Sequence, residues 1–172
     1  PMPHLYAVLL GGEAPGSNTE LHDVVFVVGD RLDDTIPALR AKWFGSQHGL
    51  HVDSYRVLDV VDGHRVELTR EAPAAGPRLF FVNLGGYRDG EFAEAHANTF
   101  VAASDAETAK ARAKASLLQG YESVHTDDLY DVDACLELDA VDGWRVRLAP
   151  TTDAESRPVN GYHPLPAPGD HA

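Results

Sequence analysis

The sequence predicts an α+β fold in which two tandem ββαββ units pack together with pseudo-twofold symmetry. The first observation is a repeat: Leu-Tyr-Ala-Val-Leu-Leu-Gly-Gly at residues 5–12 returns as Leu-Phe-Phe-Val-Asn-Leu-Gly-Gly at residues 79–86. The second is a signature near the end of each copy, Val-Asp-Gly-His-Arg at 61–65 and Val-Asp-Gly-Trp-Arg at 141–145. A solenoid would need several short repeats to bury its core, so two long copies indicate a mixed αβ unit used twice.

The repeat divides the chain into four parts. The first unit spans residues 5–69, a linker with Pro73 and Pro77 covers 70–78, and the second unit spans 79–149. Residues 150–172 carry five prolines and no hydrophobic period, so we expect an extended tail lying on the surface. Because units of this size bury only a modest fraction of their surface, we expect the two to share a core.

The elements of the first unit follow from hydrophobic period and turn residues. Residues 5–10 are apolar throughout and predict a buried strand, and the valine-rich residues 21–28 predict a second one. A helix follows, ending near Gly45, and Pro37 is tolerated only if this helix begins near Asp33. Its apolar stripe has the helical spacing and consists of Leu32, Ile36, Leu39 and Trp43.

The second unit repeats this pattern with clearer signals. Ser104 and Glu107 have capping-box spacing, and the helix stripe that follows consists of Ala106, Ala109, Ala113 and Leu117. The next strand alternates, which predicts one face made of Val132, Ala134, Leu136, Leu138 and Ala140. In both units a hairpin is then expected with a type I′ turn at Asp62-Gly63 and at Asp142-Gly143.

Composition excludes several classes of protein. The chain has 27 acidic and 14 basic residues, a net charge of −13, which disfavours nucleic-acid binding. Cys135 is the one cysteine, so neither an internal disulfide nor a thiolate zinc site is available. No apolar run approaches the length of a membrane span, and no signal peptide is evident. We expect a cytoplasmic monomer or homodimer whose partner is a small ligand or a protein.

Paired histidines and carboxylates are the strongest candidates for a site. Alternate residues of a strand share a face, so Glu20 with His22, and His51 with Asp53, each form one patch. Adjacent strands would merge the patches into a cluster suited to a divalent metal such as zinc. Three interpretations stay open: a metal site, an organic-ligand site, or a buried hydrogen-bond network. The repeat offers a second set: Glu94, His96, His125 and Asp127.

Glycine pairs and two arginines are further candidates for ligand binding. The pairs Gly11-Gly12 and Gly85-Gly86 follow a strand, where they could form an anion-holding nest or a turn that needs positive φ. Arg65 and Arg145 lie at equivalent hairpin positions. They could clamp a carboxylate, or pack on the sheet and pair with the many acidic residues.

With these motifs, the sequence resembles the bacterial family catalogued as domain of unknown function 1543, in two tandem copies. The resemblance covers residues 5–149 and includes the Leu-Gly-Gly loop, the Glu-x-His and His-x-Asp pairs, and both hairpin signatures. Its most specific piece is Asn-Leu-Gly-Gly-Tyr at 83–87. It implies a compact bacterial αβ protein and brings no established activity. The second copy differs from the first by six extra residues before its hairpin.

Three functions are compatible with these features. The first is a non-enzymatic binding module that holds a metal or a small ligand at the two histidine–carboxylate patches. The second is a metal-dependent hydrolase in which the ion activates water and Glu20 or Glu94 serves as base. The third is an acidic interaction or inhibitor protein with purely structural histidines.

Overall fold

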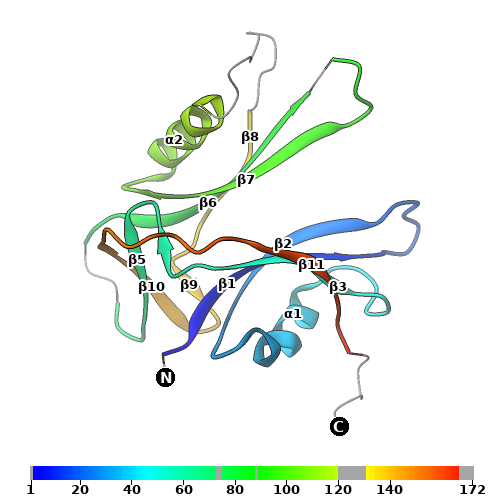
Figure 1. The fold of residues 1–172 in the computed structure, drawn as a ribbon, viewed down its shortest axis with the longest axis horizontal. Helices are drawn as coiled ribbons and strands as arrows, with labels where there is room; N and C mark the ends of the chain where they lie inside the picture. The colour runs from blue at the N-terminus through cyan, green and yellow to red at the C-terminus, as the bar shows by residue number, and fades with distance from the viewer. Residues whose placement is uncertain (1, 73–74, 88, 120–130, 167–172) are drawn as a thin grey trace. The chain divides into compact units, whose positions relative to one another are not determined.

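The computed structural model describes residues 2–72, 75–87, 89–119 and 131–166 and confirms the α+β fold (Figure 1). The described chain divides into two compact units. Unit 1 contains residues 2–59, 141–144 and 154–166, and unit 2 contains the described residues between 60 and 140 together with 145–153. Unit 1 therefore includes residues 141–144 of the second copy of the repeat, and unit 2 includes residues 60–69 of the first copy.

Unit 1 is built on a four-stranded antiparallel sheet in the order β11-β3-β1-β2. The strands are β1 (His4–Gly12), β2 (Leu21–Gly29), β3 (His51–Val57) and β11 (Val159–Pro164). Part of the expected extended tail is thus an edge strand. One face of this sheet packs against the helical segment around a core that includes Val8, Leu10, Val27, Leu39, Trp43 and Val52.

The helical segment of unit 1 begins as a 3₁₀ turn. This turn, η1, spans Leu32–Thr35 and leads directly into α1, which spans Ile36–Lys42. Pro37 falls in the first turn of α1, where its missing N–H costs nothing. Leu39 and Trp43 are buried and Leu32 packs against them, as the predicted stripe requires.

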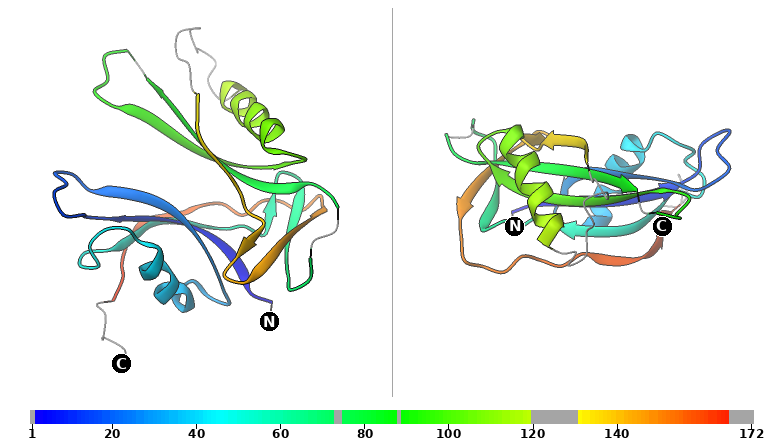
Figure 2. Two further views of the ribbon diagram at one scale, coloured as in Figure 1. Left: turned by 180° about the vertical axis from the view of Figure 1, so that it is seen from behind. Right: turned by 90° about the horizontal axis from the view of Figure 1, so that it is seen from above.

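Unit 2 contains a three-stranded antiparallel sheet in the order β7-β6-β8, with β6 (Arg78–Tyr87), β7 (Glu94–Ala103) and β8 (Asp131–Glu137). Strands β8-β6-β7 repeat the order β3-β1-β2, so the two sheets share three strands in the same order, and β11 adds a fourth in unit 1 (Figure 2). Helix α2 (Ala106–Gln119) lies on this sheet with Ala109 and Ala113 fully buried. The pseudo-twofold packing of the copies stays a prediction.

A further sheet collects the hairpins of both copies. Its order is β4-β5-β10-β9, from β4 (Val60–Val61), β5 (His64–Thr69), β9 (Ala140–Val141) and β10 (Trp144–Pro150). Among the described residues, each copy therefore has five strands rather than the expected four, because the strand expected to lead into the hairpin breaks before β4 and β9. The Asp-Gly turns have positive φ at both residues, as type I′ demands: 50° and 71° at 62–63, 50° and 79° at 142–143.

Two local predictions in unit 2 are wrong. Asp105, rather than Ser104, caps α2, because its carboxylate accepts the N–H of Thr108 at 2.8 Å. In β8 the residue that packs on the core is Cys135, while Leu136 is 50% exposed. The register with β6 decides this: Cys135 pairs with the core residue Val82, and Leu136 with the neighbour on the other face.

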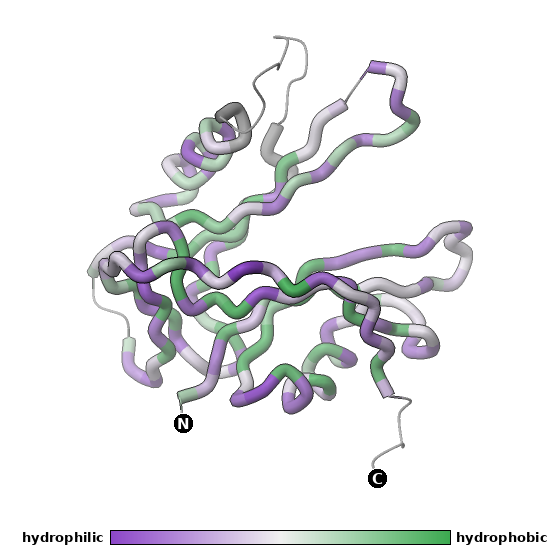
Figure 3. Tube along the Cα trace, in the orientation of Figure 1, coloured by the Kyte–Doolittle hydropathy of each residue, from purple (hydrophilic) through white to green (hydrophobic). Residues whose placement is uncertain are grey.

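Both helices mix apolar and hydrophilic residues along their length (Figure 3). Within the described residues, no helix is both long and apolar enough to cross a membrane.

Candidate metal centre

Gly11, on the central strand of unit 1, aligns the predicted ligands. It pairs with His22 on β2 and with His51 on β3, so the two histidines flank the glycine on one face of the sheet. Glu20 directly precedes β2. The pairing of the two i, i+2 patches predicted for the first copy is therefore present.

Asp53 joins the same group by strand alternation, next to a β-bulge. The β1–β3 register shifts between Leu9 and Leu10, where Leu9 pairs with Ser54 and Leu10 with Val52. Asp53 is thus the extra residue of the bulge, free of a Cα partner on β1. Asp53 lies on the His51 side, two residues along the strand, while Val52 between them packs in the core; the bulge leaves Asp53 without a pairing residue and places Ser54 on the same side.

The four side chains converge closely. His51 Nε2 lies 3.0 Å from Glu20 Oε1 and 3.2 Å from Asp53 Oδ1. His22 Nε2 lies 3.0 Å from the same Glu20 oxygen and 2.8 Å from Asp53 Oδ2. Glu20, His51 and Asp53 can each offer a ligand atom to one point. The His51 side chain is 5% exposed, whereas those of Glu20 and His22 are about half exposed, so the cluster has a closed and an open side.

A backbone hydrogen bond sets the tautomer of His51. Its Nδ1 lies 2.9 Å from the carbonyl oxygen of Gly49, which can only accept, so Nδ1 carries a proton. In a neutral ring, Nε2 would then direct a lone pair at two carboxylates. Either a second proton or a cation must occupy that space. A metal-binding histidine usually donates the N–H of one ring nitrogen to a carbonyl or carboxylate and directs the lone pair of the other nitrogen at the metal.

Electrostatics favour positive charge at the same place. Burial is the largest influence on the pKa of His51 and acts to lower it. The hydrogen bond to Gly49 and the carboxylates of Asp53 and Glu20 together outweigh burial and raise the pKa above its ordinary value of 6.5. Without metal, a proton on Nε2 serves as the cation, and a divalent ion would compete with it.

Asp53 also has an unsatisfied oxygen. Its Oδ2 atom is buried and accepts no hydrogen bond, although His22 Nε2 is only 2.8 Å away. The short distance therefore does not have hydrogen-bond geometry, and we interpret it as two ligand-type atoms meeting. A buried carboxylate oxygen without a hydrogen bond is costly unless positive charge lies beside it, and either a proton on His22 or a metal ion would supply that charge.

Gly11 is required because the cluster occupies the position of its missing side chain. A Cβ at residue 11 would lie within 2.7 Å of Asp53 Oδ2, His51 Nε2 and Glu20 Oε1. The expected turn with positive φ is wrong: Gly11 and Gly12 continue β1, and neither has positive φ. The same correction applies to Gly85-Gly86, which lie inside β6.

Tyr162, which the sequence analysis missed, covers His51. The β11–β3 register shifts between Asn160 and His163, and the rings of Tyr162 and His51 are 4.4 Å apart between centroids. The Ser54 hydroxyl donates to Asn160 Oδ1 at 2.8 Å and ties the two strands together. Tyr162 lies more than 100 residues from Gly11 in a proline-rich segment, where no local pattern marks it as part of a site.

The donor set fits zinc. Imidazole nitrogen and carboxylate oxygen are ordinary zinc ligands at roughly 2.0–2.2 Å, which separates neighbouring ligands by roughly 3.3 Å in a tetrahedron. The distances around Glu20 and Asp53 are slightly shorter, so a bound ion would spread the ligands by a few tenths of an ångström. Glu20, His51 and Asp53 would hold it, with His22 at the open side.

In the second copy, the described residues contain only part of the predicted cluster. Glu94 and His96 are present on β7 with His96 Nε2 3.7 Å from Glu94 Oε2, while His125 and Asp127 lie outside the described residues. The register pairs Gly85 with the backbone of Asp131, as Gly11 pairs with His51. The six extra residues therefore precede β8, and an aspartate stands in the position of His51.

One predicted arginine clamp has a protein partner. Arg65 is paired with Asp153 at 2.5 Å, which is the pairing with acidic residues considered as the alternative. Arg145 pairs along the backbone with Thr69 in the β5–β10 ladder.

Comparisons with known proteins agree with this architecture. The model of a family described as "Domain of Unknown Function (DUF1543)" matches residues 17–68 and 91–148, one segment in each copy. The crystal structure of a protein Il1583 from Idiomarina loihiensis is similar with a TM-score of 0.75 and 39% sequence identity, covering 95% of this chain and 98% of that one. A search of curated proteins gave no match.

Proposed function

Because the chain belongs to the Domain of Unknown Function (DUF1543) family, which carries no activity with it, we propose a function from the site itself: the protein binds a divalent metal ion, of which zinc fits best, through Glu20, His51 and Asp53. The ion would sit at the Gly11 position of the sheet, with His22 and solvent on its open side.

One observation carries this proposal. The Nε2 atom of a nearly fully buried histidine faces two carboxylate oxygens while its Nδ1 proton is committed to Gly49. A hydrogen-bond network alone satisfies this arrangement only with a charged imidazole. The unsatisfied Oδ2 of Asp53 and the space kept by Gly11 support a cation larger than a proton.

The test is elemental analysis of tag-free protein purified without chelator, followed by calorimetric titration of the metal-free protein with Zn²⁺. We expect one zinc to bind at this cluster in unit 1, and His51→Ala to remove it. His48→Ala is the matched control, since His48 is exposed and outside the cluster. No saturable zinc binding by the wild type, together with equal melting temperatures with and without chelator, would leave only a structural network.

The exposed side of the cluster favours a second candidate, a metal-dependent hydrolase. Glu20 is 46% exposed beside His22, so water could reach an ion there and Glu20 could accept its proton. Screening zinc-loaded protein against ester, amide and phosphoester substrates tests this. Turnover that survives chelation, or that is unchanged in His51→Ala, would rule out the cluster as its origin.

A further inference from the structure

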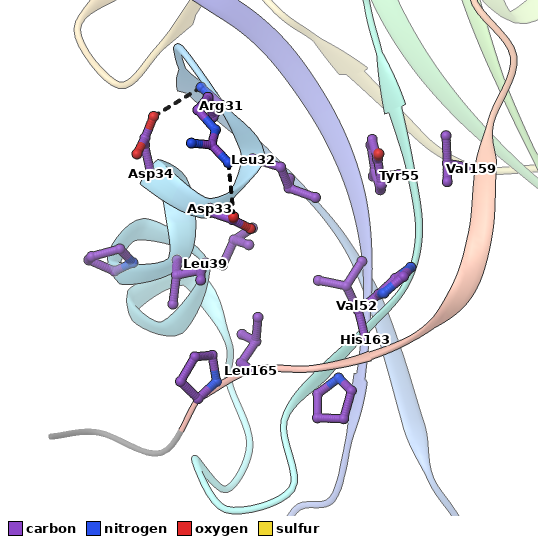
Figure 4. Close-up of a pocket in the computed structure, with 14 residues that line it drawn as sticks. Arg31, Leu32, Asp33, Asp34, Leu39, Val52, Tyr55, Val159, His163 and Leu165 are labelled. Carbon is purple, nitrogen blue, oxygen red and sulfur yellow. Dashed lines mark hydrogen bonds and ion pairs between the residues drawn. The ribbon is translucent and has the colours of Figure 1, made fainter. Parts of the chain in front are cut away.

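A groove of about 930 Å³ lies on the helix-side face of unit 1 (Figure 4). It is bounded by η1 and α1 on one side and by β3 and β11 on the other. Val52 lines the groove, whereas its neighbour His51 points to the opposite face of the sheet. The groove and the metal cluster are therefore separate sites that share one strand.

The walls of the groove are apolar. Leu39 and Val52 are buried at its base, while Ile36, Tyr55 and Leu165 remain partly accessible and Val159 is 44% exposed. Prolines 37, 164 and 166 add rigid apolar surface. A volume of this size, with largely apolar walls and a few polar groups, is typical of small-molecule sites.

The charged residues of the lining, Arg31, Asp33 and Asp34, gather at the η1 end, and the His163 ring lines the β11 side. The Arg31 guanidinium lies 3.6 Å from Asp33, which offsets that carboxylate. Asp34 accepts only the neutral backbone N–H of Arg31, at 3.1 Å, so its charge is uncompensated by this contact. The lining thus carries one excess negative charge.

Two observations indicate that this end is electronegative. Burial raises the pKa of Tyr6, and so do the neighbouring Tyr55, Asp34 and Asp30, which places both carboxylates within electrostatic reach of the core beneath the groove. The whole chain carries a net charge of −13, which attracts cations and repels anions.

The groove arises from differences between the two copies. Helix α1 has 7 residues, whereas α2 has 14 and lays Ala109 and Ala113 directly on its sheet. The shorter α1 leaves the β3 end of its sheet open, and β11 builds the far wall there.

We propose that this groove binds a small amphipathic amine. Its ammonium would lie at Asp34 on the η1 side, and its apolar body would cross the groove toward Tyr55 and Val159. This site is independent of the proposed metal binding.

The test uses three probes of equal chain length, n-octylamine, n-octanol and sodium octanoate, titrated into isotope-labelled full-length protein in the presence of chelator. We expect octylamine to shift backbone signals of η1, α1, β3 and β11, with weaker binding of octanol and weakest of octanoate. Asp34→Asn should reduce octylamine affinity roughly threefold, the size of a partly exposed ion pair, and leave octanol unchanged. Glu13→Gln, an exposed charge change outside the groove, is the matched control and should have no effect.

Two further outcomes decide the question. Val159→Ser should weaken all three probes, since it removes wall rather than charge; a melting curve confirms that each variant folds. Octanoate binding as tightly as octylamine, or signals shifting outside the groove, would overturn the proposal. Equal octylamine affinity in Asp34→Asn and the wild type would also overturn it.

Discussion

The carboxylate of Asp142 accepts a hydrogen bond at 3.0 Å from the backbone N–H of Val28, which precedes it by 114 residues. The other oxygen of this carboxylate accepts a hydrogen bond from Lys42 Nζ at 2.7 Å. Asp62 does the same in unit 2, where it accepts the N–H of Ala102 at 2.9 Å and pairs with Arg112. Each unit is therefore fastened by the turn aspartate of the other copy, and Val28 and Ala102 occupy matching positions of the repeat.

We expect Asp142→Ala to lower the free energy of unfolding by about 1–2 kcal/mol, the size of a hydrogen bond to a charged group at a partly exposed site. Asp142→Asn is the matched control, because asparagine also tolerates positive φ and keeps an acceptor but loses the charge. Asp142→Asn should lower the free energy of unfolding by less than Asp142→Ala. Urea denaturation measures both, and equal stability of the alanine variant and the wild type would contradict the fastening role.

Gly11→Ala should abolish zinc binding although it removes no ligand. The added methyl group would occupy the space where Asp53, His51 and Glu20 meet. Gly12→Ala is the neighbouring control: its Cβ would press on the Trp43 ring at 3.0 Å, which affects stability but not the cluster. Calorimetric titration with Zn²⁺ distinguishes them, and retained binding in Gly11→Ala would place the metal elsewhere.

Tyr162→Ala should increase the rate of zinc release by roughly three- to tenfold, because it removes an aromatic contact from the ring of His51. Tyr162→Phe keeps the ring and should behave as the wild type. Release is followed by transfer of the ion to a chromogenic chelator. If both variants release zinc alike, the phenol hydroxyl rather than the ring is responsible.

The stability of the metal-free protein should decrease as pH rises above neutrality. The pKa of His51 is higher in the folded protein than its ordinary value of 6.5, so the folded state holds this proton more tightly. Its stabilising contribution is complete below that ordinary value and is lost as pH rises through the folded pKa. Chemical denaturation in chelator from about pH 5.5 to about pH 8.5 measures it. His51→Gln should lack this part of the pH dependence, and an identical slope would show that other groups cause it.

The sequence by itself determined the features that depend on local chemistry. The repeat, the two Asp-Gly turns and the α1 stripe follow from residues close in the chain, where period and positive φ leave few alternatives. The pairing of Glu20 with His22 and of His51 with Asp53 also followed from strand alternation. Pro37 correctly marked where the helix of the first copy could begin.

Tertiary structure decided what depends on distant pairing. The bulge at Asp53, the placement of the six extra residues before β8, and the inward face of Cys135 are set by register with β1 and β6. Register depends on how two strands pair, so the sequence of one strand alone does not determine it. Gly11 could not be distinguished from a turn glycine until the side chains of Glu20, His51 and Asp53 were placed over it. Tyr162 and the exchanged aspartates join residues 40 to 114 positions apart, where the gain from contact must offset loop closure, and no local pattern records that balance.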